Sequence, residues 1–598
     1  MKKGDLIEGV IEEITFPNKG IFHAEGIRVS VKGVLPGATV RVRIKKKRQD
    51  HAEAILLDTI TESPLATKKP VCPHFYECGG CTYQNIAYTN QLRLKEKMVK
   101  DLLLPVVPDL PWEGILPSPE PLQYRNKMEF TFGDAEKDGP LTLGLHRQGS
   151  TYDVLEVKNC AIVRPAWNEI LKYTQKFFRE HKVNFYHKMQ HYGILRHLVV
   201  RQSFYDGGIL VNLVTTTKHE LPDPKRKAAS CDAPKGPGEN SNTVASNSDA
   251  SIFNELPGAV DSLSSEKKAI DLPKKNPEVT AGLRNEVLQE LHLPEYVAGL
   301  VSLEASGKFD TLTTHSHLAG VLYTENDNLS DAVVCDSLTK LYGDDYLMEE
   351  VLGLKFKISP FSFFQTNTRG CEVLYSKVRE YVLSVYEEAV NSDEDESSKN
   401  EENLSKNAKD SLINEKKTVK KAGVIYDLYS GTGTIAQLMA PIARKVYGIE
   451  IVEEAVEAAK ENAKLNKLGN CEFIAGDVLA KLDEIEEKPD FIILDPPREG
   501  CTPKALNKII SYGVPYMVYI SCKPTSLAED LVALQKNGYK VIRACAVDEF
   551  PNTQHVETIC LLGNKSKRPD DRIQVRVDAD QIFDILEREK EEKLRQSD

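Results

Sequence analysis

DLYSGTGT, residues 427–434, is a glycine-rich turn between an apolar segment with the pattern of a β-strand and one with the pattern of a helix. Glycines at such a turn let the backbone approach a ligand closely. The pattern is G-x-G without a third glycine, so the dinucleotide-binding fingerprint is incomplete. The strand–turn–helix order still predicts a ligand site at the end of this strand.

Strands and helices alternate after this turn. The apolar segments KVYGIEIV, CEFIAG, DFIILD and YMVYIS have the pattern of strands, and helical segments such as EEAVEAAKENAKLN lie between them. KVIRACAVDEF and HVETICLLG complete the series. Near-continuous apolar strands that alternate with helices are typical of a doubly wound parallel sheet. We therefore predict an α/β fold for this part of the chain.

Acidic residues stand at the ends of three of these strands. Glu450 ends the second strand, Asp477 follows the third and Asp495 follows the fourth. An acid at the position of Glu450 suits the hydroxyl groups of a ribose. The turn carries no lysine of the kind that binds nucleotide phosphates, which favours an adenosyl ligand. We predict S-adenosylmethionine (SAM), with a nicotinamide cofactor as the alternative.

Cys522 and Glu557 are candidates for the reactive groups. Cys522 follows the fifth strand, at the same rim as Asp495, and a lysine and a helix come next. Such a cysteine can be held as a thiolate nucleophile. Glu557 begins the closing strand and could act as a base. The plainer alternatives are a small buried apolar side chain for Cys522 and an edge charge for Glu557.

CPHFYECGGC, residues 72–81, places three cysteines close together. Its C-x5-C-x2-C spacing differs from the paired C-x2-C motifs of typical zinc sites. The N-terminus lacks the apolar core of a secretory signal, so twelve cysteines indicate thiols, metals or catalysis rather than disulfides. From the residues alone, a disulfide, zinc, an iron–sulfur cluster and chance all remain open.

The net charge of −12 does not resemble that of a nucleic-acid-binding protein, but the cations are clustered. RVRIKKKR (residues 41–48) is strongly basic, and Arg125 and Lys127 lie in a second basic stretch. These residues are candidates for phosphate contacts. No stretch approaches 18 consecutive apolar residues, so we expect no membrane span and a cytoplasmic protein.

Composition divides the chain into eight segments. They are a small basic β-barrel (1–62), a central domain with the cysteines (63–217), a low-complexity insertion (218–286), the rest of the central domain (287–350), the start of the catalytic domain (351–390), a polar insertion (391–421), the cofactor-binding domain (422–563) and a charged tail (564–598). Within the fourth segment, residues 298–305, AGLVSLEA, are predicted as a strand.

The chain resembles the RNA uracil-C5 methyltransferase family, in the branch that carries a TRAM domain (an RNA-binding β-barrel) and a 4Fe-4S cluster. The motifs CPHFYECGGC, YRNKMEF, FSFFQTN, DLYSGTGT, LDPPREG, YISCKPTSL and HVET occur in the order of the family. The resemblance covers most of the chain apart from the two insertions and the tail. It implies a SAM-dependent methyltransferase sheet with a TRAM barrel and a β-rich iron–sulfur domain.

The family also implies roles for individual residues. Cys522 corresponds to the nucleophile and Glu557 to the general base. The implied SAM contacts are Gln365, Tyr429, Glu450, Asp477 and Asp495. The implied cluster ligands are Cys72, Cys78, Cys81 and Cys160, the last in EVKNCAIV. From the residues alone, zinc with four cysteines remains possible.

The implied reaction is methylation at C5 of a uridine in RNA through a covalent adduct between the cysteine and C6. The TRAM barrel and the cluster favour 23S ribosomal RNA as the target, with a uridine in the T-loop of transfer RNA as the alternative. No membrane or obligate protein partner is indicated. Four further functions remain open, namely an amino-group methyltransferase, a cytosine-C5 enzyme, a non-catalytic RNA-binding or assembly factor, and a redox protein that uses the cluster.

Overall fold

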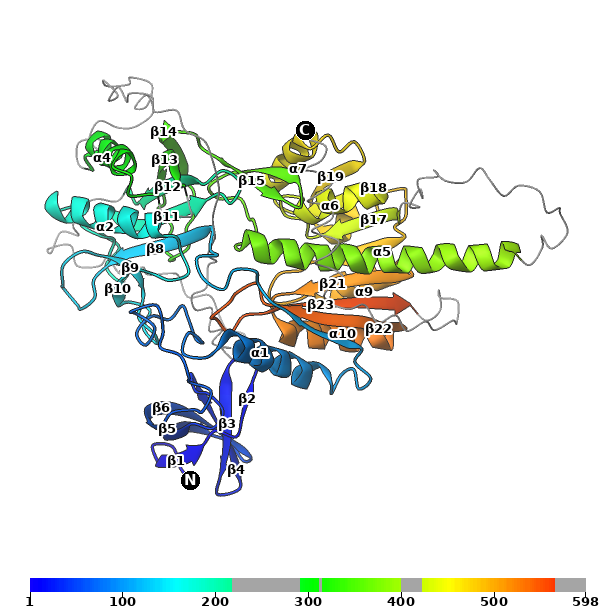
Figure 1. Cartoon of the computed structure of the whole chain (residues 1–598), viewed down its shortest axis with the longest axis horizontal. Helices are drawn as coiled ribbons and strands as arrows, with labels where there is room; N and C mark the ends of the chain where they lie inside the picture. The colour runs from blue at the N-terminus through cyan, green and yellow to red at the C-terminus, as the bar shows by residue number, and fades with distance from the viewer. Residues whose placement is uncertain (218–290, 311–314, 399–421, 565–598) are drawn as a thin grey trace, which may run out of the picture.

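The computed structural model describes residues 1–217, 291–310, 315–398 and 422–564, and these residues form three units around separate β-sheets. Figure 1 shows the N-terminal unit in blue, the central unit mainly in cyan and green, and the C-terminal unit from green to red apart from two of its elements, which are blue. No helix in the described ranges combines the length and the apolar character that crossing a bilayer requires. The predicted low-complexity insertion at 218–286 and the tail at 564–598 lie almost wholly outside the described residues.

The N-terminal unit is a six-stranded sheet in the order β1-β5-β6-β4-β3-β2. Its alternating side chains face a small core on one side and solvent on the other, as β5 shows by burying Val40 and Val42 and exposing Arg41 and Arg43. The strands are β1 (Leu6–Val10), β2 (Glu13–Thr15), β3 (Lys19–Ala24), β4 (Ile27–Lys32), β5 (Thr39–Lys47) and β6 (His51–Thr61).

The central unit is a seven-stranded sheet in the order β10-β9-β8-β11-β12-β13-β14, with helices α2 and α4 packed on one face (Figure 1). Trp167 of α2 and Tyr296 of α4 are fully buried in the core between them. The elements are β8 (Lys127–Gly133), β9 (Thr142–His146), β10 (Val154–Glu156), α2 (Pro165–Glu180), β11 (Leu195–Gln202), β12 (Gly208–Thr215), α4 (Leu293–Ala305), β13 (His317–Glu325) and β14 (Ser337–Gly343).

Helix α4 contradicts the strand predicted at residues 298–305, so that prediction was wrong. The buried side chains of α4 recur at intervals of three and four residues, as they do on one face of a helix. They are Leu293, Tyr296, Val297, Leu300 and Val301. The predicted stretch was too short to contain this full period, and a short apolar run does not distinguish a buried strand from a buried helix.

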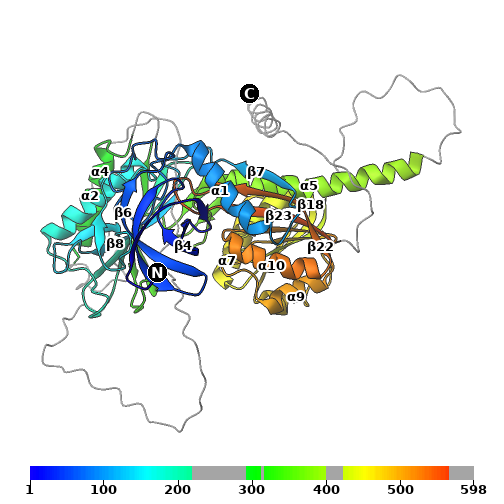
Figure 2. The same cartoon turned by 90° about the horizontal axis from the view of Figure 1, so that it is seen from below.

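The C-terminal unit is an eight-stranded sheet in the order β19-β18-β17-β20-β21-β23-β22-β7, with helices on both faces (Figure 2). β17 to β21 are mutually parallel, as predicted, whereas β23 runs antiparallel between β21 and β22. The strands are β17 (Ala422–Leu428), β18 (Ala443–Glu450), β19 (Cys471–Ala475), β20 (Phe491–Leu494), β21 (Tyr516–Ser521), β22 (Tyr539–Val547), β23 (Glu557–Asn564) and β7 (Trp112–Leu116).

Two separate cores lie on the two faces of this sheet. Helices α5, α6 and α7 pack on one face, and α1, α8, α9 and α10 pack on the other. Ile425 contributes to the first core, whereas its neighbours Val424 and Tyr426 contribute to the second. The helices are α1 (Tyr88–Leu103), α5 (Thr368–Ser398), α6 (Thr434–Met439), the 3-10 turn η1 (Ala440–Ile442), α7 (Glu453–Leu465), α8 (Val478–Lys481), α9 (Pro503–Ser511) and α10 (Pro524–Lys536).

Several elements lie differently from the predicted segments. β7 and α1, both placed with the central domain by sequence, pack on the C-terminal unit, where β7 pairs in parallel with β22. Helix α5 continues to Ser398, through the first part of the predicted polar insertion. The hairpin of β15 (Leu347–Val351) and β16 (Leu354–Ile358) packs with α5 and joins the central and C-terminal units. Local sequence patterns carry no signal for which sheet edge a short strand joins.

Candidate active site and cysteine group

The ends of β17 to β21 and the start of β23 meet at one rim of the C-terminal sheet, because parallel strands share their carboxyl edge. Glu450 is the last residue of β18, and Asp495 follows β20 directly. Cys522 follows β21, and Glu557 is the first residue of the antiparallel β23. The structure therefore brings the residues predicted at separate strand ends to one place.

The glycine turn after β17 has a backbone that bulky residues rarely adopt. Tyr429, Gly431 and Gly433 all have positive φ angles, of 68°, 53° and 73°. A Cβ atom at Gly433 would lie 2.5 Å from the ring of Phe473, so glycine is required there. Glu450 Oε2 accepts the N–H of Gly431 at 2.9 Å, which fixes the turn against the end of β18.

The loop that carries Gln365 lies against this turn. Thr432 Oγ1 donates a hydrogen bond to the backbone oxygen of Phe363 at 3.2 Å. Gln365 is half-buried, and its side chain bonds the buried phenol of Tyr375. The same phenol interacts electrostatically with Asp495. Gln365 thereby lies at the rim, although it comes from a segment before β17, the first of the parallel strands β17 to β21.

Tyr429 and Asp477 define the other side of the turn. The carboxylate of Asp477 interacts electrostatically with the half-buried phenol of Tyr429, and burial is the larger cause that raises the pKa of that phenol. Asp477 is exposed and also lines a hollow of about 580 Å³ beside Lys504 and Lys508. All five residues expected to hold the cofactor are thus located around the glycine turn.

Cys522 and Glu557 form the candidate reactive pair. Glu557 is buried, with 3% of its surface exposed, and Cys522 is half-buried. Burial raises the pKa of the Cys522 thiol, and the nearby carboxylates of Glu557 and Asp495 raise it further. The thiol therefore needs a cation nearby to ionise at neutral pH.

Arg498 supplies that cation. Its guanidinium bonds the Cys522 sulfur and lowers the pKa of the thiol, against the larger effect of burial. Arg498 lies within the quoted LDPPREG motif but was not singled out from sequence. The sequence feature that could have identified Arg498 is its position three residues after Asp495, in the loop that follows β20.

His555 is a second neighbour that the sequence analysis missed. Burial lowers the pKa of its imidazole to about 3, and the positive charges of Arg498, Lys95 and Arg125 add to this effect. The side chain is therefore neutral at physiological pH. It lies two residues before Glu557, in the loop that leads into β23.

The four predicted cluster cysteines form one group in the central unit. Cys72, Cys78 and Cys160 are buried and Cys81 is half-buried, and each interacts electrostatically with others of the group. Burial and the neighbouring Cys72 thiol raise the pKa of Cys78 to about 11. Gln84 Nε2 donates to the Cys81 sulfur at 3.3 Å, and the backbone N–H of Gly80 donates to that of Cys78 at 3.3 Å.

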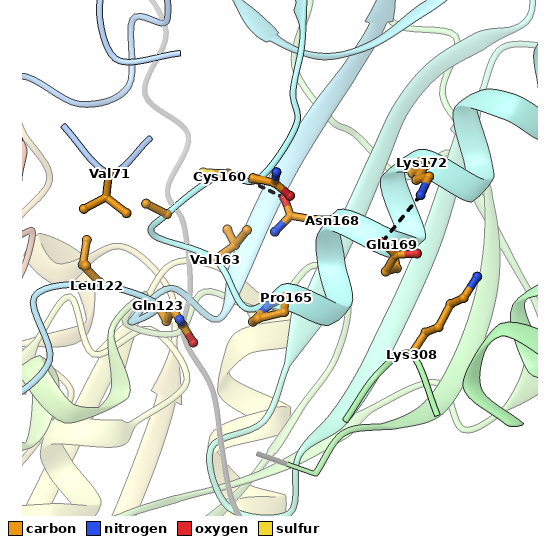
Figure 3. Close-up of a pocket in the computed structure, with 12 residues that line it drawn as sticks. Val71, Leu122, Gln123, Cys160, Val163, Pro165, Asn168, Glu169, Lys172 and Lys308 are labelled. Atoms are coloured by element: carbon orange, nitrogen blue, oxygen red, sulfur yellow. Dashed lines mark hydrogen bonds and ion pairs between the residues drawn. The ribbon is translucent and has the colours of Figure 1, made fainter. Parts of the chain in front are cut away.

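A hollow of about 650 Å³ lies beside the cysteine group rather than at the rim (Figure 3). Cys160, Asn168 and Gln123 line it, and Lys172 and Lys308 lie toward its other end. Asn168 Oδ1 accepts the backbone N–H of Cys160 at 3.0 Å, so the wall of the hollow also orients a cysteine. None of the candidate reactive residues borders it.

The basic residues predicted to contact phosphate differ in their surroundings. Arg125 is buried, with 3% of its surface exposed, and interacts with His555, so it lies inside the protein near the reactive pair. Lys127 forms an ion pair with Glu129 at 2.6 Å. In the run at residues 41–48, Arg41 pairs with Glu8 at 2.8 Å, and the basic side chains of the run are exposed while Val42 and Ile44 between them are buried.

Comparisons with known proteins relate the whole chain to RNA-modifying enzymes. The family model described as tRNA (uracil-5-)-methyltransferase matches residues 379–565. An "uncharacterized RNA methyltransferase" of Clostridium tetani is 39% identical over 94% of this chain and 99% of its own length. Another, from Caldanaerobacter subterraneus subsp. tengcongensis, is 40% identical with the same coverage.

A solved structure has the same fold over most of the chain. It is the tRNA (uracil-54, C5)-methyltransferase of Pyrococcus abyssi in complex with S-adenosyl-L-homocysteine. The match has a TM-score of 0.58 at 21% identity and covers 93% of this chain and 100% of the other. At this identity the likeness establishes the shared methyltransferase fold.

Proposed function

Because the chain belongs to the RNA uracil-C5 methyltransferase family, we propose that it methylates C5 of a uridine through a covalent bond between Cys522 and C6 of the base. The single observation that carries this proposal is the contact of Cys522 with Glu557 and Arg498 at the rim that also holds the glycine turn. A nucleophile, a carboxylate and a ligand site converge there, as the reaction requires.

The proposed reaction uses the thiol and the carboxylate at different steps. The Cys522 thiolate adds to C6 of a uracil that has been turned out of its stack, and the electrons of the C5–C6 bond pass to C5 and O4. C5 then takes a methyl group as the carbon–sulfonium bond of SAM breaks. Glu557 removes the proton from C5, the C5–C6 double bond re-forms, and the Cys522 thiolate leaves.

The residues around the glycine turn fit an adenosyl ligand. At Gly431 a Cβ atom would meet only the ring of Phe363, at 3.9 Å, so the turn leaves room there for a close approach, and Glu450 lies where an acid binds ribose hydroxyls. We propose that Gln365, Tyr429, Glu450, Asp477 and Asp495 hold SAM. The structure of the Pyrococcus abyssi enzyme, solved with S-adenosyl-L-homocysteine, supports this class of ligand.

We further propose that Cys72, Cys78, Cys81 and Cys160 hold a 4Fe-4S cluster. The four thiols interact with one another, and burial raises the pKa of three of them, Cys78, Cys81 and Cys160, so they fit a positively charged group in their midst. In a single zinc site the sulfurs lie about 4 Å apart, because each is about 2.3 Å from the metal. Among the described residues, these cysteines do not form a group of three with ligand atoms within 4.8 Å, which favours the wider cluster.

The cluster proposal is tested by composition. Protein purified without oxygen is expected to contain four iron and four sulfide ions per chain, following the stoichiometry of the cluster. Cys81→Ser is expected to lose most of both, whereas Cys335→Ser, which changes an exposed cysteine of the same unit, keeps them. One zinc ion per chain and no sulfide in the wild type would overturn the proposal.

For the RNA target, we propose 23S ribosomal RNA, with transfer RNA as the alternative. The N-terminal sheet, with its exposed Arg41, Arg43 and neighbouring lysines, supports the reading of residues 1–62 as a TRAM barrel that contacts phosphates. A non-catalytic RNA-binding factor would use the same surface without transferring methyl groups. The reactive pair at the rim favours the enzyme.

The deciding experiment uses RNA that carries 5-fluorouridine, together with SAM and the full-length protein. Fluorine at C5 cannot leave as a proton does, so the adduct with Cys522 is expected to persist and to appear as a shifted band on a denaturing gel. The samples are the wild type, Cys522→Ala and Cys335→Ala, the last as a control for an exposed thiol. Sequencing the crosslinked RNA identifies the target uridine.

An adduct with the wild type and Cys335→Ala, but not with Cys522→Ala, supports the proposed chemistry. If transfer RNA but not 23S fragments is trapped, the covalent reaction stands and the target is transfer RNA. The absence of any wild-type adduct with both RNAs would overturn the thiolate mechanism. Continued methyl transfer by Cys522→Ala on ordinary RNA would then favour an amino-group methyltransferase.

A further inference from the structure

Two histidines and a glutamate come together where helix α2 ends and helix α4 begins, in the central unit. His181 directly follows α2, His292 precedes α4, and Glu295 lies in the first turn of α4. Figure 1 shows the two helices on the same side of the central sheet, and their side chains share one core. This group lies outside the rim of the C-terminal sheet and includes none of the four cysteines.

The three ligand atoms are close enough to share one ion. Glu295 Oε2 lies 3.2 Å from His292 Nδ1 and 3.7 Å from His181 Nε2, and one ligand atom from each of the three side chains lies within 4.8 Å of the other two. Around a tetrahedral zinc ion with ligands at about 2.0–2.2 Å, neighbouring ligand atoms lie about 3.4 Å apart. The two distances from the Glu295 carboxylate to the histidine nitrogens, 3.2 and 3.7 Å, lie on either side of that separation.

The hydrogen bonding of His181 presents a free nitrogen to the group. Its Nδ1 donates to the backbone oxygen of Phe177 at 2.8 Å, so in the neutral ring the lone pair is on Nε2, the atom that faces Glu295. A backbone carbonyl that fixes the tautomer in this way is the usual second partner of a metal-binding histidine. The ring is also stacked on Phe177, with 4.2 Å between ring centroids.

The backbone conformation at His292 fits a side chain that is held in position as a metal ligand. It adopts the left-handed conformation, with φ 49° and ψ 39°, which is uncommon for a residue with a side chain. This conformation turns the chain into α4 and brings the His292 ring to 4.3 Å from that of His181. At this distance the two imidazoles can both offer a ring nitrogen to one shared cation.

We propose that His181, His292 and Glu295 bind a divalent transition-metal ion, of which Zn²⁺ suits the two-imidazole, one-carboxylate donor set best, with water completing the coordination. The ion would join the end of α2 to the start of α4. The partial negative charge at the carboxyl end of α2 attracts a cation. The partial positive charge at the amino end of α4 repels a cation, and the Glu295 carboxylate offsets that repulsion. The side chains are 27%, 41% and 67% exposed in that order, so an ion can enter from solvent.

Zinc titration of the anaerobically purified full-length protein tests the site, because the cysteines are then the same in every sample. The samples are the wild type, His292→Ala, Glu295→Gln and His51→Ala. His51 pairs with Asp50 at 2.9 Å, so it provides a matched histidine–carboxylate pair without a second imidazole. Calorimetry gives the number of zinc ions bound and their affinity, and Co²⁺ absorption separates nitrogen and oxygen ligands from thiolates.

The wild type and His51→Ala are expected to bind one more zinc ion than His292→Ala. Glu295→Gln is expected to lower the affinity of that site for zinc by at least about 10–100-fold. A loss of this size follows the removal of an outer-shell partner alone. One equivalent of zinc should also raise the melting temperature of the wild type but not of His292→Ala. Equal zinc stoichiometry and affinity in the wild type, His292→Ala and Glu295→Gln would overturn the proposal, as would a Co²⁺ spectrum typical of thiolate ligands only.

Discussion

Cys522 and Glu557 lie beside each other because β21 and β23 are antiparallel, in a register that pairs Ser521 with Thr558. The residue after the end of one strand therefore meets the first residue of the other, at the rim where the glycine turn also lies. Burial and the Glu557 carboxylate both raise the pKa of the Cys522 thiol. In the proposed reaction the Arg498 guanidinium opposes this rise and so favours the thiolate that adds to C6.

Replacing Glu557 by glutamine is expected to trap the reaction after methyl transfer. Without the carboxylate the C5 proton is not removed, so the bond from Cys522 to C6 cannot break. A methylated protein–RNA adduct should therefore accumulate with ordinary uridine RNA, and turnover should fall by about 10²–10⁴-fold, the usual contribution of a general base. A denaturing gel with labelled methyl-SAM measures both.

Glu529→Gln, which changes an acid in α10, is the control for Glu557→Gln and should turn over normally. If Glu557→Gln released methylated RNA at the wild-type rate, Glu557 would not be the base. If the variant formed no adduct at all, the carboxylate would be needed before methyl transfer rather than after it.

Replacing Arg498 by glutamine is expected to move the acidic limb of the pH–rate profile to higher pH. The guanidinium lowers the pKa of Cys522, so its loss raises that pKa and reduces the thiolate fraction at a given pH. Each unit of increase lowers the thiolate fraction about tenfold well below the pKa. The profile of kcat/KM against pH measures the shift.

Arg498→Lys keeps a positive charge and should recover part of the activity at neutral pH. A uniform loss of activity at every pH in Arg498→Gln, with no movement of the acidic limb, would mean that Arg498 positions the substrate rather than stabilising the thiolate. Lys504→Gln, in α9 of the same unit, is a control for a general change of charge.

The sequence predicted the parallel part of the C-terminal sheet and the shared rim because both follow from local pattern. Apolar strands that alternate with helices imply parallel strands, and parallel strands place Glu450, Asp495 and Cys522 at one edge. The antiparallel insertion of β23, which brings Glu557 to Cys522, has no local signal. It depends on the pairing of segments far apart in the chain.

The contacts between units also could not be predicted from the sequence. β7 pairs with β22, which lies more than four hundred residues later in the chain. The five residues of β7 have no sequence pattern that indicates this partner. The group of His181, His292 and Glu295 depends on the packing of α4 beside α2, and the sequence predicted a strand at residues 298–305, in the later part of α4. More than one hundred residues separate His181 from His292, so no local pattern indicates that they meet.

Replacing Glu450 by alanine is expected to weaken SAM binding while leaving the sheet folded. Glu450 accepts the N–H groups of Gly431 and Val452, at 2.9 and 3.0 Å, and in the proposed site it also binds the ribose. Hydrogen bonds to a charged group contribute about 1.5–3 kcal/mol each, so the Kd for SAM should rise about 10–150-fold. Calorimetric titration with SAM, without RNA, measures this.

Glu457→Ala, in α7 after the same strand, is the control for Glu450→Ala because Glu457 pairs only with the nearby Lys460 on the helix surface among the interactions described. Its affinity for SAM should match that of the wild type. If Glu450→Ala bound SAM as tightly as Glu457→Ala did, the adenosyl ligand would lie elsewhere on the rim.

Breaking the buried ion pair of Lys95 and Asp548 is expected to lower stability more than breaking any exposed pair in its surroundings. Both side chains are fully buried, Lys95 Nζ also donates to the backbone oxygen of Phe550, and burial lowers the pKa of the ammonium. Asp548→Asn would leave a buried cation without its counter-charge, at a cost of about 3–5 kcal/mol. Urea unfolding followed by far-UV circular dichroism measures the change in midpoint.

Asp101→Asn provides the matched control, because it breaks the exposed pair of Asp101 with Lys97 on the same helix, α1, and should cost less than about 1 kcal/mol. Lys95→Met combined with Asp548→Leu should recover much of the lost stability, since it removes both buried charges. Equal midpoints for Asp548→Asn and Asp101→Asn would contradict the prediction. Because Asp548 directly follows β22 and opens the loop that leads to His555 and Glu557, the same substitution should also slow methyl transfer by displacing the base.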